Sequence, residues 1–194
     1  MTVHATTARD QAIARLRELA QLAQRSAETL PDEITEAAAL VRNVLAHGGT
    51  LFFCGNGGSA ADAQHIATEY VVRYMKNRGA LPAIALTTDT SLLTAAGNDL
   101  GFDQVFSRQV EALVREGDLL VVHSTSGTSP NVIRAAEAAR AKGAKVFALI
   151  ARDGGALRGI ADLAIVVPTD RTDRAQELHL AIQHVICELV EGDA

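Results

Sequence analysis

The stretch from Cys54 to Glu69, CGNGGSAADAQHIATE, decides the fold class of this 194-residue chain. An apolar run over residues 50–54 leads into it and predicts a buried strand. The strand breaks into a glycine-rich turn, after which a helix begins. That helix carries His65 four residues before Glu69, so both side chains project from one face. One strand–turn–helix unit therefore offers a backbone-lined anion site together with a His/Glu pair.

The rest of the chain alternates between short apolar runs and helical patterns. Further strands are predicted over residues 83–86, 119–123, 145–150 and 163–167. Helices are predicted over residues 60–74, 90–96, 103–115, 129–142 and 172–191. Nearly continuous apolar runs are typical of strands that are covered on both faces. The pattern therefore predicts an α/β three-layer sandwich with a five-stranded parallel sheet, whose ligands lie at the carboxyl ends of the strands.

Two helices are predicted before the first strand, over residues 8–29 and 32–46. They form a helical hairpin that covers one face of the sheet, or a helix pair that also packs on another subunit. We favour the second interpretation, although their stripe of small residues suits close packing of either kind. The length favours a single domain over residues 1–194, with N-terminal helices at 8–47 and an α/β core at 50–191.

Composition excludes several classes of protein. Apolar residues make up 48% of the chain and charged residues 21%, which indicates a large core. The net charge of −5 and the lack of a basic run argue against nucleic-acid binding. No signal-peptide pattern is present, and the apolar runs are too short to span a membrane. Cys54 and Cys187 lack metal-type spacing and are expected to be reduced, buried thiols of a cytoplasmic protein. A nucleophilic Cys54 is the less favoured alternative.

Two loops could bind phosphate. Gly55–Ser59 lets the backbone approach an anion at the start of a helix, although a plain tight turn deserves equal weight. The second loop, HSTSGTSPN at 123–131, holds more hydroxyl groups than one helix cap needs. Ser129 is a natural N-cap before Pro130. We therefore expect this loop to bind phosphate, with His123 packing or lining the site.

The remaining polar residues are ambiguous on sequence alone. The stretch at 96–103 has ordinary turn chemistry. In the last helix, Gln176 and Glu177 lie eight and seven residues before His184, and spacing does not choose between them. His65 and Glu69 could form a surface contact, act in acid–base chemistry, or bind a divalent metal such as zinc.

Four separated motifs resemble those of the phosphoheptose isomerases, which have the sugar isomerase (SIS) domain. The motifs are CGNGGS at 54–59 with DAQH at 62–65 and Glu69, GNDLGF at 97–102, STSG at 124–127, and RAQE at 174–177 with His184. Their order and spacing match the family over residues 8–191. The resemblance implies a flavodoxin-like sandwich, a homotetramer with sites at subunit interfaces, and one Zn²⁺ per subunit. It also implies conversion of D-sedoheptulose 7-phosphate to D-glycero-D-manno-heptose 7-phosphate, the first step towards nucleotide-activated heptose.

The resemblance also implies residue roles. Glu69 is the general base and His184 its acid partner. The zinc ligands implied are His65, Glu69, Gln176 and His184. The phosphate-binding residues implied are Ser124, Thr125, Ser126 and Ser129. The residues implied to line the sugar are Asn56, Gly57, Gly58, Ser59, Arg73, Asn98, Asp99, Asp173 and Gln176. The family thus favours Gln176 over Glu177, which spacing could not do.

The chain departs from the family pattern at Thr128, where Asn is usual, and at His123, where an apolar residue is usual. Thr128 keeps a hydroxyl group beside the phosphate, whereas His123 changes the polarity of the pocket. Two alternatives stay open: a non-catalytic regulator of the initiator-associating type, and an isomerase of another sugar phosphate. The presence of Glu69 and His184 favours the enzyme.

Overall fold

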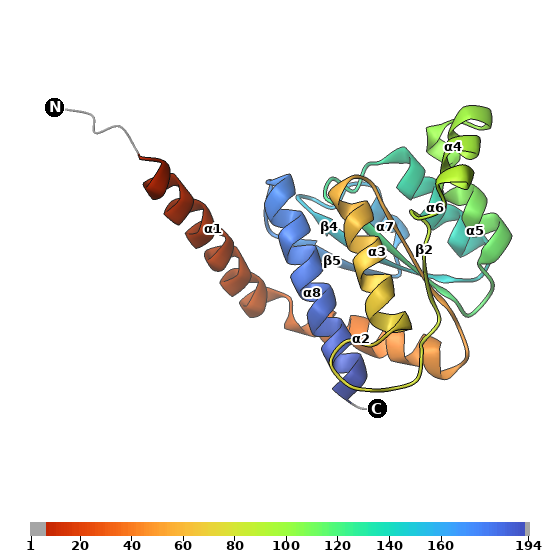
Figure 1. Cartoon of the computed structure of the whole chain (residues 1–194), viewed down its shortest axis with the longest axis horizontal. Helices are drawn as coiled ribbons and strands as arrows, with labels where there is room; N and C mark the ends of the chain where they lie inside the picture. Colours follow the sequence, from red (N-terminus) through yellow and green to blue (C-terminus); the bar gives the residue numbers. More distant parts are fainter. Residues whose placement is uncertain (1–6, 193–194) are drawn as a thin grey trace.

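The protein is a three-layer α/β sandwich, shown by a computed structural model that describes residues 7–192 (Figure 1). Its five strands are all parallel and stand in the order β2-β1-β3-β4-β5. The strands are β1 (Leu51–Gly55), β2 (Ala83–Ala85), β3 (Leu119–Ser124), β4 (Lys145–Ala151) and β5 (Leu163–Val167). The predicted fold class and all five predicted strands are confirmed, with ends that shift by one residue at most.

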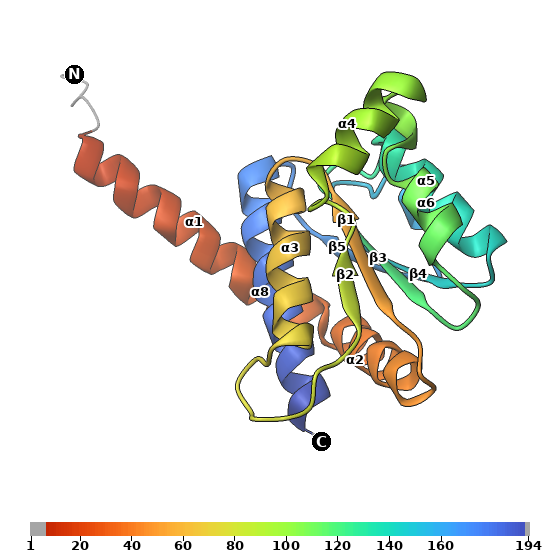
Figure 2. The same ribbon diagram turned by 45° about the vertical axis from the view of Figure 1, so that its right-hand side comes forward.

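Helices cover both faces of the sheet. They are α1 (Ala8–Thr29), α2 (Pro31–Ala46), α3 (Gly58–Val71), α4 (Thr90–Asp99), α5 (Ser107–Leu113), α6 (Pro130–Ala141), α7 (Leu157–Ile160) and α8 (Thr172–Gly192), with a 3₁₀ turn η1 at Phe102–Gln104. One face is covered by α2, α3 and α8, and the other by α5, α6 and α7 (Figures 1 and 2). Successive strand residues alternate between these two layers: Phe53 packs towards α8, whereas Phe52 and Cys54 pack towards α6.

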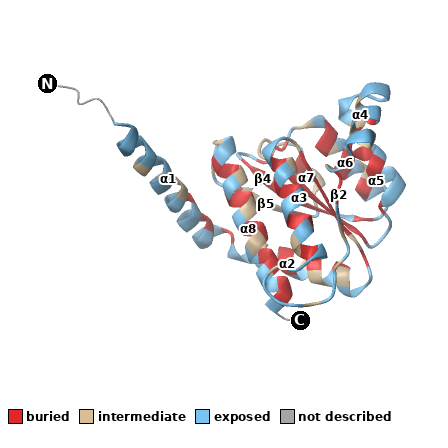
Figure 3. Ribbon diagram, viewed as in Figure 1, coloured by how far each residue is buried: buried red, intermediate tan, exposed pale blue. Residues whose placement is uncertain are grey.

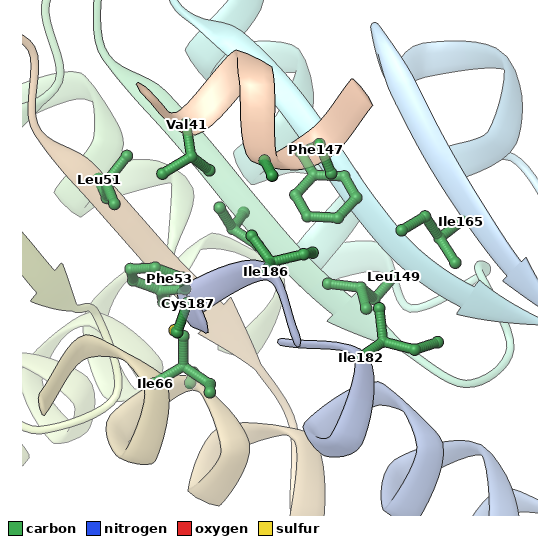
Figure 4. Close-up of a cluster of buried hydrophobic side chains, with 14 of the residues drawn as sticks. Val41, Leu51, Phe53, Ile66, Phe147, Leu149, Ile165, Ile182, Ile186 and Cys187 are labelled. Atoms are coloured by element: carbon green, nitrogen blue, oxygen red, sulfur yellow. The ribbon is translucent and has the colours of Figure 1, made fainter. Parts of the chain in front are cut away.

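The core between the sheet and α8 is dense and apolar. Figure 4 shows Phe53 and Leu149 of the sheet close to Ile182 and Ile186 of α8. These side chains are at most 4% exposed. Burying a side chain of this size stabilises a fold by about 1.5–3 kcal/mol. The position of α8 on the sheet is therefore fixed by packing before any polar contact is considered.

The two N-terminal helices behave differently. Helix α2 lies against the sheet, whereas α1 extends away from the body of the molecule (Figures 1 and 2). A capping box between Thr7 and Asp10 starts α1, but most of its surface is exposed (Figure 3), and Leu16 is 69% exposed. The predicted helix pair is present, yet only α2 of the two covers the sheet.

Three helix predictions need correction, and one further helix was missed. The helix predicted to reach residue 74 ends at Val71, and the one predicted to end at Ala96 continues to Asp99. The helix predicted over 103–115 is divided into η1 and α5. Helix α7 was not predicted at all, because its four residues are too few to show a helical period.

Candidate functional site

The two predicted anion-binding loops meet at the carboxyl edge of the sheet. β1 pairs directly with β3, and Gly55 is the register partner of His123. On either side of this pair the chain order runs in opposite directions, and such a switch point is where open α/β sheets bind ligands. A cavity of about 220 Å³ lies here. It is lined by Asn56, Gly57, Ser59, His123, Ser124, Thr125, Ser129, Thr172 and Gln176.

Close backbone approach explains the glycine-rich turn. A Cβ atom at Gly55 would lie 2.7 Å from the carbonyl oxygen of Ser59 and 2.9 Å from that of His123, so no side chain fits there. Gly57 has φ +57°, a conformation that glycine adopts without strain. The loop is tied to α6 by a reciprocal pair of 2.9 Å hydrogen bonds between the amides of Asn56 and Asn131. No role was predicted for Asn131, and its position directly after Ser129-Pro130 is the only feature of the sequence that singles it out.

The serine-rich loop is held by its own hydroxyl groups. Ser124 Oγ accepts a hydrogen bond from the amide of Gly127 at 3.1 Å, and Ser126 Oγ accepts one from the amide of Thr128 at 3.2 Å. Ser129 occupies the predicted N-cap position of α6, but its side chain makes no capping hydrogen bond and lines the cavity instead. The loop therefore leaves a hydroxyl free to contact a ligand.

His65, Glu69 and His184 converge from two helices that lie side by side in both views (Figures 1 and 2). The Nε2 atoms of His65 and His184 are 3.0 Å apart, and His65 Nε2 lies 3.2 Å from Glu69 Oε1. One ligand atom from each residue lies within 4.8 Å of the other two. Two imidazole nitrogens and a carboxylate oxygen at this spacing fit a divalent metal such as zinc.

This trio is separated from the cavity along the helices. His65 lies seven residues after the first residue of α3, and His184 lies eight after Gln176 on α8. A helix rises 1.5 Å per residue, so the backbone positions of His65 and His184 lie roughly 10–12 Å along α3 and α8 from those of Gly58 and Gln176 beside the cavity. An extended sugar phosphate could occupy both places at once, with its phosphate in the cavity.

Burial sets the protonation of several groups near the site. The pKa of the His184 imidazole is lowered by burial and by the neighbouring His65, so the ring favours its neutral form. Burial raises the pKa of the Asp62 carboxyl to about 6, although His65 acts against this shift. Burial also raises the pKa of Cys54 and Cys187 to about 12. Both thiols are free and buried as predicted, and neither is a nucleophile at neutral pH.

His123 forms part of the cavity's floor. It is fully buried, which lowers its pKa to about 3, and its Nε2 lies 3.2 Å from Gln183 Nε2 of α8. Its ring stacks over Phe53 with centroids 6.4 Å apart. The neutral imidazole therefore both packs in the core and lines the cavity, as the sequence indicated.

Gln176 and Glu177 point to different surroundings. Gln176 lines the cavity and touches Gly58, where an added Cβ would lie 2.6 Å from Oε1 of the amide. Glu177 is exposed and pairs with Arg174. Of these two residues, the cavity therefore contains the one that the family resemblance selects.

Some of the predicted site residues do not line this cavity within the described chain. Gly58 and Ser126 stand beside it in the two loops. The others do not line it and are exposed: Arg73, Asn98, Asp99 and Asp173, the last of which directly follows the lining residue Thr172. Asn98 and Asp99 form the end of α4 rather than the predicted turn, and Asp173 pairs with Arg171. Thr172, conversely, lines the cavity although no ligand-binding role was predicted for it.

Comparisons with known proteins identify the family to which the chain belongs. The family model described as SIS domain matches residues 16–151. The phosphoheptose isomerase of Chlorobaculum parvum is 56% identical over 176 residues, which cover 89% of this chain and 84% of that protein. The phosphoheptose isomerase of Rhodospirillum rubrum is 55% identical over 158 residues, which cover 81% of this chain and 84% of that protein.

A solved structure has the same fold over nearly the whole chain. The phosphoheptose isomerase of Neisseria gonorrhoeae superposes with a TM-score of 0.91 at 44% identity, covering 96% of this chain and 100% of that one.

Proposed function

Since the chain belongs to the phosphoheptose isomerase family of SIS-domain proteins, we propose that it converts D-sedoheptulose 7-phosphate to D-glycero-D-manno-heptose 7-phosphate. This aldose–ketose isomerisation begins the synthesis of nucleotide-activated heptose. The observation that carries the proposal is the convergence of Glu69 and His184 on His65, roughly 10–12 Å along α3 and α8 from the hydroxyl-lined cavity. That separation suits a seven-carbon sugar, whose phosphate and reacting carbons lie at opposite ends.

The phosphate group is proposed to bind in the cavity. Ser124, Thr125, Ser126 and Ser129 supply hydroxyl groups, and the start of α6, where Pro130 has no N–H and the first amide is that of Asn131, supplies the favourable end of a helix dipole. The turn at Asn56–Ser59 then contacts the sugar with its backbone. Binding energy from the remote phosphate orients the reacting carbons without taking part in the reaction.

Glu69 is proposed to move the proton. Its carboxylate takes a hydrogen from C1 of the ketose, which leaves an enediol between C1 and C2. Returning the proton to C2 gives the aldose, while the hydroxyl proton passes from O1 to O2. His184, on the neighbouring helix, is placed to assist at these oxygens as acid partner. Each such positioned acid or base typically contributes about 10²–10⁴-fold in rate.

A zinc ion is proposed as cofactor, one per subunit. His65, Glu69 and His184 would hold it, and Gln176 is proposed as the fourth ligand, with its side chain turned from the cavity towards the other three. The ion would shift during turnover, or would mainly organise the site, so that Glu69 and His184 are free to move protons. The ion would polarise the sugar oxygens as a Lewis acid. The three donors already clustered on α3 and α8 support this proposal. Zinc content by metal analysis of the wild type and of His65→Ala tests it.

A homotetramer with sites at subunit interfaces is also proposed. Large apolar side chains are exposed on α1, α8 and the segment after α3: Leu16, Val72, Met75, Val185 and Leu189. Assembly would cover them and would let the exposed Arg73, Asn98, Asp99 and Asp173 reach a sugar. Analytical ultracentrifugation tests this state.

The chain is further proposed to act as a single domain in the cytoplasm, where its thiols would stay reduced. Within residues 7–192, no helix is long and apolar enough to cross a membrane.

The decisive experiment incubates the purified chain with D-sedoheptulose 7-phosphate and follows the aldose by NMR. Pentose and hexose ketose phosphates are tested in parallel. Preferred conversion of the heptulose supports the proposal. Faster conversion of a shorter ketose phosphate would assign the enzyme to another sugar, and no conversion of any of them would remove the proposed function.

A further inference from the structure

Tyr74 stacks on the imidazole of His184. The two ring centroids lie 5.4 Å apart, and the ring planes differ by 16°. His65 meets the same imidazole edge-on, with centroids 5.0 Å apart at 62°. His184 is therefore held against a parallel aromatic face while its Nε2 points to His65. An imidazole without such a neighbour turns easily about its last side-chain torsion, which has no sharp minimum.

Tyr74 lies outside the helices, in the segment after α3, and backbone hydrogen bonds to Glu191 hold this segment in place. The amides of Tyr74, Met75 and Lys76 each donate a 2.8 Å hydrogen bond to the carboxylate of Glu191. Glu191 lies in the last turns of α8 and its side chain is only 3% exposed. A buried carboxylate needs such donors to offset its lost hydration. The segment after α3 is thus anchored to the helix that carries His184.

Arg78 connects Glu191 of α8 to the end of α3. Its Nε donates to Glu191 at 3.0 Å. Its Nη2 donates to the carbonyl oxygen of Glu69 at 2.7 Å, and its Nη1 to that of Tyr70 at 2.8 Å. These carbonyls belong to the last turn of α3, and that of Tyr70 also accepts a hydrogen bond from the amide of Leu81. One guanidinium group therefore connects the backbone of the proposed base to the buried carboxylate on α8.

From these contacts we propose that Tyr74 is a positioning residue for His184, and that Glu191 and Arg78 hold it in place. The inference rests on the proposed function, in which His184 is the acid partner of Glu69. Glu191 follows His184 by seven residues, so the two side chains are nearly eclipsed on α8, two turns apart. Because only a short segment joins Tyr74 to Arg78, a displacement of Glu191 or Arg78 also moves the Tyr74 ring that stacks on His184.

The test compares Tyr74→Leu, which removes the ring, with Tyr74→Phe, which keeps it. We expect Tyr74→Leu to lower kcat by about 10–10²-fold with little change in KM, because a misplaced catalytic group costs rate rather than binding. Tyr74→Phe should retain wild-type kcat. Glu191→Gln should lower kcat in the same direction, whereas Glu188→Gln, an exposed carboxylate on the same helix, serves as the matched control and should change nothing.

A second measurement does not depend on turnover. In protein labelled with ¹³C at histidine Cε1, the His184 signal is assigned by its absence in His184→Gln. A stacked ring shifts this signal, so the shift should be lost in Tyr74→Leu and kept in Tyr74→Phe.

Two results would overturn the proposal: an unchanged His184 signal in folded Tyr74→Leu, or equal loss of kcat in Tyr74→Phe and Tyr74→Leu. If Tyr74→Leu does not fold, a wild-type His184 signal and kcat in Glu191→Gln overturn it instead. If the wild type turns over no sugar phosphate, the proposed function fails, while the histidine signal still decides whether Tyr74 positions the ring.

Discussion

Replacing Gly58 by alanine should lower activity without unfolding the protein. A Cβ at this position would lie 2.6 Å from Oε1 of Gln176 and 2.7 Å from its Nε2. Ordinary contact begins at 3.4 Å, so the Gln176 amide must retreat by 3.4 − 2.6 = 0.8 Å. A shift of about 1 Å in a positioned group can cost about 10²-fold in rate. We expect kcat/KM for D-sedoheptulose 7-phosphate to fall by about that factor.

The stability of Gly58→Ala should equal or exceed that of the wild type, although its activity falls. Gly58 is the first residue of α3 and has no positive φ, and alanine is preferred over glycine in helices by up to about 1 kcal/mol. The melting temperature of Gly58→Ala should therefore equal or exceed that of the wild type. Gly79→Ala is the matched control, because no atom lies within 4 Å of the added Cβ there.

A double variant tests whether the collision with Gln176 causes the loss of activity. In Gly58→Ala combined with Gln176→Ala, the collision is absent, so activity should be no lower than in Gln176→Ala alone. The reasoning is refuted if Gly58→Ala keeps full activity, or if it loses activity only because it melts at a lower temperature.

Two further predictions concern stability near the site. Asp62→Asn should raise the melting temperature at pH 8, because burial raises the pKa of this carboxyl to about 6 and its charged form lacks a partner at Oδ2. The charged carboxyl destabilises the fold fully above pH 6, and this destabilisation disappears as pH falls below the ordinary pKa of 3.8. Calorimetry from pH 8 to pH 4 measures the gain in melting temperature of Asp62→Asn over the wild type. A gain that stays constant over this range would contradict the assignment. Asn131→Ala should lower the free energy of unfolding by about 1–3 kcal/mol, because the partly buried amide of Asn56 loses both of its hydrogen bonds to Asn131. Urea titration measures this change. An unchanged urea midpoint would show that water replaces the two hydrogen bonds.

The sequence predicted the sheet well because its strands are covered on both faces. A run such as residues 119–122 is apolar throughout, and the polar residues that follow from His123 mark where it stops. The helix ends were harder, as the end of α3 illustrates. The helical pattern continues to residue 74, but the chain leaves the helix at Val71, and the amides of the next segment bind Glu191. A contact between residues more than 110 positions apart leaves no local signal.

The site was predicted unevenly for a similar reason. His65 and Glu69 share a helix, so their proximity follows from spacing. Their approach to His184 depends on how α3 and α8 pack, which spacing does not contain. The stacking of Tyr74 on His184 was not foreseen either, because it requires that same packing together with the anchor at Glu191.

The account depends most on proton transfer by Glu69. Its direct test is ¹H NMR of D-sedoheptulose 7-phosphate in D₂O, which measures hydrogen exchange at C1, with ligand affinity measured by calorimetry for the same samples. We expect exchange in the wild type and a loss of at least about 10²-fold in Glu69→Gln, with the dissociation constant nearly unchanged. Exchange at the wild-type rate in Glu69→Gln would contradict the assignment of this carboxylate as the base.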